Sequence, residues 1–206
     1  MFNFQGLPAT GDPRQADVVI VQAFGRNGFS DQELNMLGKL TEVEQISDVE
    51  MMDILRQWNF DPGQSNRELA EECRRIMDKY KLSAIVQWEI AVAFPTDWYA
   101  ANNQRIICLW PSAESLQYFS TRKVLENTLA KMIKRRWSLP IELAHHGQIL
   151  RAYLMVRKIF GNAPVILSPY PKSFDRKSVQ PWTRSRWRWL CREIIVRWHH
   201  LLKRWV

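Results

Sequence analysis

The chain has 206 residues, 46% hydrophobic and 24% charged, and this composition excludes a protein that is disordered throughout. Its three cysteines lie too far apart for a disulfide framework or a cysteine-based metal or redox motif. The net charge of +8 favours anionic partners, and the length allows one domain with a core. With no secretory leader, no membrane-spanning run and no disulfide pattern, we expect a cytoplasmic protein, which could also associate peripherally with a membrane.

Short apolar runs alternate with longer amphipathic segments along the chain. The apolar runs predict buried strands at 17–23, 84–88, 105–110, 141–144 and 164–167. The amphipathic segments predict helices at 31–40, 48–58, 65–81, 121–137, 147–160 and 183–205, with 89–97 as a connection whose end could open a short helix. Two serines are expected to start helices through capping boxes, Ser47 with Glu50 and Ser65 with Glu68.

This alternation predicts an α/β fold, with an open, mainly parallel, Rossmann-like sheet and helices on both of its faces. Residues 1–206 are expected to form a single domain. The basic, Trp-rich helix at 182–205 is packed on that domain or appended to it.

The turn after the first strand has two interpretations. It contains Gly25 and Arg26 but lacks the Gly-x-Gly-x-x-Gly pattern of dinucleotide sites, so no cofactor is expected. Gly25 and Arg26 could form a ligand loop in which the guanidinium grips an anion. The alternative is a plain tight turn.

Polar residues also stand at the next junctions between strands and helices. Glu89 leaves the second strand and could face the crevice as a catalytic base or a hydrogen-bond acceptor, or be a half-exposed edge residue. Thr121 opens a helix, and Glu126 and Asn127 follow in its early turns. Asn127 suits a polar ligand, whereas Glu126 could equally be structural because the helix dipole stabilises a carboxylate there.

The fourth strand ends in two histidines, which precede a helix opening near Gly147. His145 is the candidate acid or base, and His146 and Gln148 are candidate ligand contacts at the helix N-terminus. Arg151 follows and could clamp a phosphate or carboxylate. The alternative is a structural histidine pair, and no metal site is expected because no further ligand has suitable spacing.

Two of these segments resemble motifs of a known bacterial family. Residues 121–127 resemble the Ser-x-Asn-Thr-x-Glu-Asn motif of the SanA/ElyC/YdcF-like family, and 144–152 resemble its strand-end His followed by His-x-x-Arg-Ala. Within the second motif Gln148 stands where the family has its second His. Residues 17–23 match the opening strand in character, and 189–193 resemble a C-terminal Trp-x-x-Arg-Glu segment. The resemblance implies a Rossmann-like sheet with a polar pocket at its strand ends and a role in envelope biogenesis.

The leading expectation is therefore a small-ligand or anion-binding domain of this type, which could be an enzyme on a phosphorylated or nucleotide-like substrate. The alternative is a non-catalytic interaction module whose C-terminal helix docks on an anionic membrane or a partner. In that helix Trp and Arg interleave, as in interfacial helices. Nucleic acid is not expected, because no recognised nucleic-acid motif is present.

Overall fold

Five parallel strands form the centre of the molecule. The computed structural model describes residues 8–27, 36–37, 39–40, 46–110, 120–167 and 170–202, so most of the helix expected at 31–40 lies outside the described residues. The strand order is β3-β2-β1-β4-β5, and every described strand pair is parallel. The strands are β1 (Val18–Val21), β2 (Ser83–Gln87), β3 (Ile106–Leu109), β4 (Pro140–Leu143) and β5 (Val165–Ile166). The expected parallel α/β sheet is confirmed.

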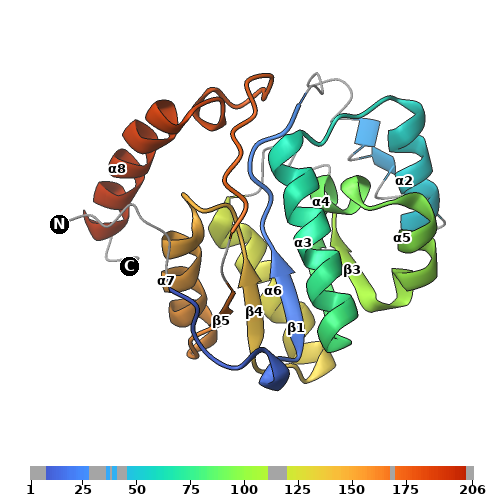
Figure 1. Ribbon diagram of the computed structural model, residues 1–206, viewed down its shortest axis with the longest axis horizontal. Helices are drawn as coiled ribbons and strands as arrows, with labels where there is room; N and C mark the ends of the chain where they lie inside the picture. The colour runs from blue at the N-terminus through green and yellow to red at the C-terminus, as the bar shows by residue number, and fades with distance from the viewer. Residues whose placement is uncertain are drawn as a thin grey trace.

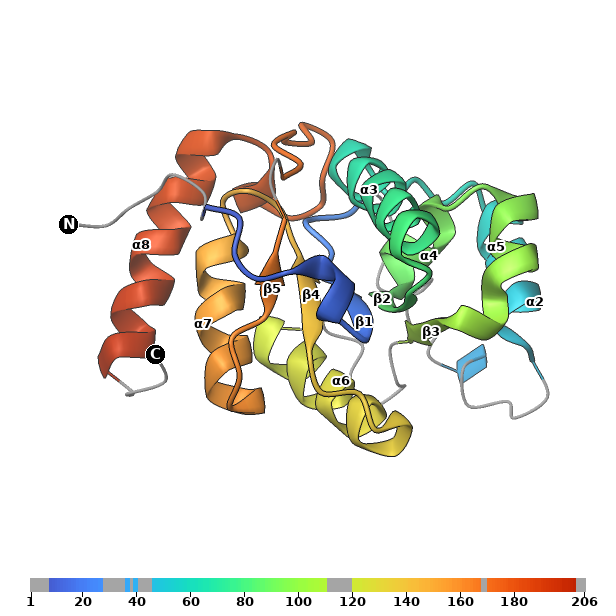
Figure 2. The ribbon, with the colours of Figure 1, turned by 60° about the horizontal axis from the view of Figure 1, so that its bottom comes forward.

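Helices cover both faces of this sheet (Figures 1 and 2). They are α2 (Asp48–Gln57), α3 (Gln64–Tyr80), α4 (Trp88–Ala93), α5 (Thr96–Asn102), α6 (Thr121–Arg135), α7 (Ile149–Phe160) and α8 (Arg186–Leu202), with short 3-10 turns η1 (Pro13–Gln15), η2 (Asn103–Arg105) and η4 (Pro181–Thr183). The terminal helix therefore starts later than expected, after the separate turn η4. Helix α8 lies at the β5 edge, beyond α7, at the end of the molecule opposite α2 and α5 (Figures 1 and 2).

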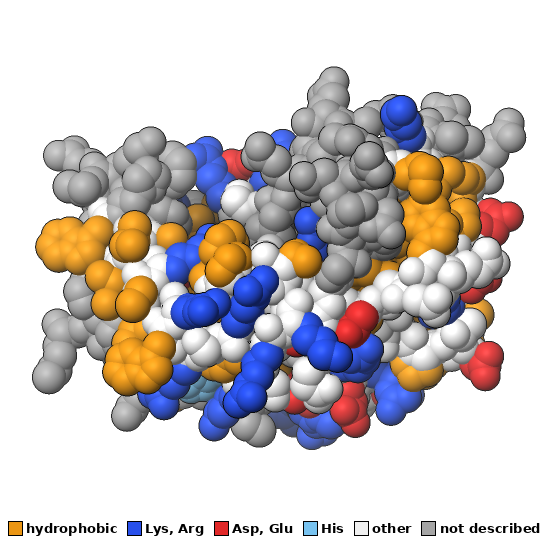
Figure 3. Space-filling model, turned by 90° about the horizontal axis from the view of Figure 1, so that it is seen from above, with side chains coloured by type: hydrophobic (Ala, Val, Ile, Leu, Met, Phe, Trp, Pro, Cys, Tyr) orange, Lys and Arg blue, Asp and Glu red, His pale blue; other side chains and the backbone are white. Residues whose placement is uncertain are grey.

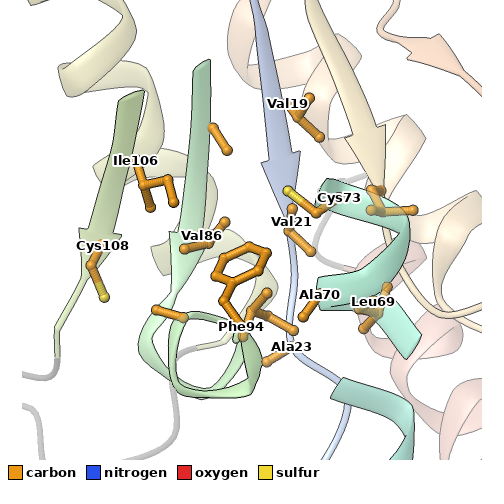
Figure 4. Packing of buried hydrophobic residues seen from close by; sticks show 14 of the residues in the cluster. Val19, Val21, Ala23, Leu69, Ala70, Cys73, Val86, Phe94, Ile106 and Cys108 are labelled. Carbon is orange, nitrogen blue, oxygen red and sulfur yellow. The ribbon is translucent and has the colours of Figure 1, made fainter. Parts of the chain in front are cut away.

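The alternation of side chains along β1 explains the two layers. Successive side chains of a strand point to opposite faces. Val19 and Val21 pack in a cluster with α2, α3 and α4, whereas Val18 and Ile20 pack in a second cluster with α6 and α7. Figure 4 shows the first cluster, in which side chains of β1, β2, β3 and α3 point toward one another around Phe94. Burial on both faces is why β1 is a continuous apolar run and the other strands are mostly apolar.

Of the two capping boxes expected from the sequence, one is present and the other is not. The Ser47–Glu50 capping box is present at the start of α2. The Ser65 cap is wrong, because α3 starts at Gln64 and its N-cap is Gly63, at φ 84°. Ser65 instead donates a hydrogen bond to the carbonyl of Ser173, whose own hydroxyl donates to Glu68. These side chains therefore tie α3 to the segment that leads into α8.

The expectation of a connection at 89–97 is wrong for its first part, whereas the short helix expected to open at its end is present as α5. Helix α4 starts directly after β2, with Gln87 as its N-cap, and α5 follows at Thr96. Burial explains the helix, because Trp88 through Val92 are all buried and their backbone groups need partners that water cannot supply. Among the described residues, no helix is long and apolar enough to cross a membrane.

Candidate ligand site at the carboxyl ends of the strands

The sheet order places a crevice between β1 and β4. Strands β2 and β3 lie on one side of β1, and β4 and β5 lie on the other side. The strand order therefore reverses between β1 and β4. Ligands of open α/β sheets bind outside the carboxyl ends of the strands where the order reverses. The residues that follow β1 and β4 therefore lie where a ligand of this fold would bind.

Four polar side chains form a network on the α6–α7 side of this crevice. Gln22 Nε2 donates to Glu142 Oε1 at 2.6 Å. Gln148 Nε2 lies 3.1 Å from Gln22 Oε1 and 3.2 Å from Thr121 Oγ1. The network joins β1, β4 and the first residues of α6 and α7. Thr121 and Gln148 are thus brought together as expected for one site.

Sequence reasoning missed Glu142 and Gln22, which hold this network together. Glu142 is buried in the middle of β4, and burial raises its pKa well above the usual value although the Gln22 amide opposes the shift. Burial therefore favours the protonated, neutral form of this carboxyl. Its Oε2 has no hydrogen-bond partner in the described part of the chain. A charged residue type inside an otherwise apolar strand was the available signal.

His145 lies on the opposite side of the crevice. Its ring stacks on Phe24, with centroids 3.6 Å apart, and meets Phe174 edge-on. Its Nδ1 accepts a hydrogen bond from the Gly147 N–H at 3.2 Å. Burial lowers the pKa of His145 to about 3, so the imidazole is neutral and held in one orientation at neutral pH.

Next to His145 the surface opens into a pocket of about 280 Å³. Its lining residues come from the β4–α7 turn, the segment before α8 and the start of α8: His145, His146, Gly147, Lys172, Phe174, Arg186, Trp189 and Leu190. Lys172 and Arg186 bring positive charge to the pocket, and none of its lining residues is a carboxylate. The pKa of His146 is lowered by burial and then by repulsion from Lys172 and Arg186.

Helix α8 can close this pocket because Gly147, in the β4–α7 turn, has no side chain. A Cβ at Gly147 would collide with the indole nitrogen of Trp189, so only glycine allows α8 to pack this closely on the β4–α7 turn. Trp189 also contacts Phe24 edge-on, at a centroid distance of 4.9 Å. The buried face of α8 is therefore joined to the end of β1 as well as to the turn after β4.

Arg151 contacts the same helix. Arg151 Nη2 lies 3.8 Å from Glu193 Oε2 of α8, and both side chains are buried. Its guanidinium also lies over the Trp189 ring, 5.6 Å from the centroid. The anion that this arginine was expected to clamp is thus supplied by the chain itself, so Arg151 holds α8 in position beside the pocket.

The turn after β1 is a packed turn. Gly25 has φ 75°, and a Cβ there would lie 2.6 Å from Thr183 Oγ1, which leaves no room for a ligand. The Asn66 side chain accepts from Phe24 N–H and donates to the Gly25 carbonyl. The tight-turn interpretation therefore describes Gly25 better than the ligand-loop interpretation.

Arg26 and Glu89 form a second polar position. Glu89 is buried in the first turn of α4, and burial raises its pKa to about 7 while the positive charge of Arg26 opposes the shift. Neither residue lines the pocket beside His145. The two candidates for acid–base chemistry, His145 and Glu89, thus lie in separate surroundings.

Glu126 and Asn127 also lie outside the pocket. Glu126 pairs with Arg122 at 2.6 Å on the exposed side of α6, where it lines a different groove together with Lys158. Asn127 is half-buried, roughly two turns along α6 from Thr121. The structure therefore brings His145 and His146 together at the pocket and Thr121 and Gln148 together in the network, but leaves these two residues apart.

The described residues include no group of three or more His, Cys, Asp or Glu side chains that could hold a metal ion. No known protein family model matches the chain, and it matches no curated protein and no solved structure.

Proposed function

We propose that the chain binds a small phosphate-bearing molecule in the pocket between the β4–α7 turn and α8. The observation that carries the proposal is that His146, Lys172 and Arg186 line one pocket without a carboxylate among its lining residues. Lys172 and Arg186 carry positive charge and help to lower the pKa of His146, so an anion in the pocket is favoured electrostatically. Arginine and lysine are the side chains that proteins use to hold phosphate.

The walls of the pocket indicate what the phosphate is attached to. Phe174, Trp189 and Leu190 present aromatic and apolar surface next to the basic side chains. A pocket of about 280 Å³ lies at the small end of the range for organic ligands. A phosphate carried by a compact planar or apolar group therefore fits it best.

Two features favour binding over acid–base catalysis. The imidazole of His145 is neutral at neutral pH, since burial lowers its pKa to about 3. An efficient general acid or base has a pKa near the working pH. Glu89, whose pKa is about 7, does not line the pocket.

The resemblance of 121–127 and 144–152 to the SanA/ElyC/YdcF-like family is the reason for a wider proposal. We propose that the chain acts in the biogenesis of a bacterial envelope, as the resemblance implies. The chemistry of the pocket does not depend on this assignment.

Calorimetric titration with adenosine monophosphate, inorganic phosphate and adenosine tests the proposal. We expect the monophosphate to bind most tightly and adenosine to lose most of the affinity. Lys172→Gln/Arg186→Gln should weaken binding at least tenfold, because each charge-assisted contact contributes about 1.5–3 kcal/mol.

The matched control is Lys177→Gln/Arg188→Gln. It removes the same charge from exposed positions in the same two segments but outside the pocket. The control should bind like the wild type. Equal losses in both variants would show that net charge, and not the pocket, binds the phosphate, and no heat with either phosphate would refute the proposal.

A further inference from the structure

One face of α8 is apolar and turned away from the rest of the protein. Trp187, Cys191, Ile195 and Trp198 recur at intervals of three and four residues and so share one side of the helix. Trp187 is 77% exposed, Ile195 68% and Trp198 55%, and Cys191 is exposed as well. We call these four residues the apolar stripe. The opposite side of α8 carries the buried residues Trp189 and Glu193.

The apolar stripe continues beyond the helix. A shallow groove of about 400 Å³ is lined by Pro181, Trp182, Trp187, Arg188 and Cys191, so it extends the stripe onto η4. In Figure 3 hydrophobic side chains gather at the end of the molecule where α8 lies, and Lys and Arg side chains lie beside them. Exposed large apolar patches of this kind on a monomer mark interaction surfaces.

The charges around the stripe are almost all positive. Arg188 and Arg192 follow it on one side of the helix, and Arg186 lies on the other. The described segment 170–202 has two carboxylates, and both serve inside the protein. Glu193 is buried against Arg151, and Asp175 accepts hydrogen bonds from Asn27 Nδ2 and from backbone N–H groups. The basic residues of this segment are Lys172, Arg176, Lys177, Arg184, Arg186, Arg188, Arg192 and Arg197.

We propose that α8 docks on an anionic lipid bilayer, with the apolar stripe in the headgroup region and the flanking arginines on lipid phosphates. Tryptophan and arginine at these positions are the composition of helices that lie in a membrane interface. A second copy of this chain fits less well, since its arginine-rich flanks would face those of the first copy. The apolar stripe is separate from the ligand pocket, because none of its four residues lines the pocket; of the flanking arginines, Arg186 lines the pocket, whereas Arg188 and Arg192 do not.

The surface provides its own reporter. Cys73 and Cys108 are buried and Cys191 is exposed, so a polarity-sensitive thiol fluorophore labels the stripe selectively. With vesicles of equal parts phosphatidylcholine and phosphatidylglycerol we expect a blue shift of the label and co-sedimentation of the full chain. Vesicles of phosphatidylcholine alone should bind at least tenfold more weakly.

Trp187→Ser/Ile195→Ser/Trp198→Ser removes the apolar side chains that would enter the bilayer. We expect about 100-fold weaker partitioning, which corresponds to about 3 kcal/mol. Because all three side chains are exposed, circular dichroism should be unchanged. The control is Ile133→Ser, which removes a side chain that is 67% exposed on α6, and it should bind vesicles like the wild type.

Several outcomes would overturn the proposal. Equal binding by the triple variant and the wild type would show that charge alone attracts the protein to vesicles. If the wild-type protein sediments as a dimer without vesicles and the triple variant sediments as a monomer, the stripe binds a second copy of the chain. Tighter binding to single-stranded nucleic acid than to the anionic vesicles would assign the arginines to another polyanion.

Discussion

The buried ion pair between Arg151 and Glu193 is the contact most open to a quantitative test. We expect Arg151→Met to loosen α8 from α7 while the sheet stays intact. The change keeps most of the apolar side chain but removes the guanidinium that lies beside the buried Glu193 carboxylate. Removing one partner of a buried pair costs about 3–5 kcal/mol, and the long N–O separation of 3.8 Å places this pair near about 3 kcal/mol.

The assay is urea unfolding of four proteins: wild type, Arg151→Met, Glu193→Gln and the double variant. The double variant should recover much of the stability lost by Arg151→Met, because no buried charge then remains without its partner. Hydrogen exchange of the α8 amides should rise in Arg151→Met more than that of the strand amides, since the pair attaches α8 and not the sheet.

Arg157→Met is the matched control. Arg157 lies on the same helix but is exposed, so its loss should change stability by less than about 0.5 kcal/mol. The reasoning fails if Arg151→Met costs no more than this control. It also fails if the losses of the two single variants simply add in the double variant.

Three further predictions concern Glu89, Glu142 and Gly147. Because Glu89 has a folded pKa of about 7 and an unfolded pKa near 4.5, the protein should lose about 3 kcal/mol of stability as pH rises from about 4 to about 8.5. Glu89→Gln should remove that loss in urea titrations, and parallel pH profiles of the variant and the wild type would contradict it. Burial also raises the pKa of Glu142, so the wild type should lose stability as the pH rises above the unfolded pKa of a glutamate. Glu142→Gln should therefore match the wild type in stability at acidic pH and exceed it at neutral pH. A variant that is less stable than the wild type at neutral pH would contradict the raised pKa. Gly147→Ala should displace Trp189, lower the stability by about 1–3 kcal/mol and change the near-ultraviolet circular dichroism. An unchanged spectrum would contradict the close contact between Gly147 and Trp189.

The sequence predicted the sheet because the information for it is local. The strands are short, mostly apolar runs, of which β1 consists entirely of β-branched residues, and the intervening helices favour parallel pairing. Helix α4 was missed for the opposite reason. Its six residues carry no side-chain cap, and only burial in the finished fold favours a helix there.

The candidate site was predicted only in part, because its contacts join distant parts of the chain. His145 and His146 could be found from their position after β4. The partner of Arg151 comes from α8, and the partner of Glu142 comes from the end of β1. The pocket also needs Lys172 and Arg186, which nothing in the local pattern connects to the histidines. Such tertiary pairs do not follow from periodicity or spacing.

Crystals of the protein soaked in tungstate, a heavy analogue of phosphate, provide the most direct test of the proposed ligand site. We expect an anomalous difference peak in the pocket, within contact distance of the Lys172 and Arg186 side chains, and no such peak in crystals of Lys172→Gln/Arg186→Gln. A wild-type pocket without density at saturating tungstate, or a peak that persists in the double variant, would contradict the account.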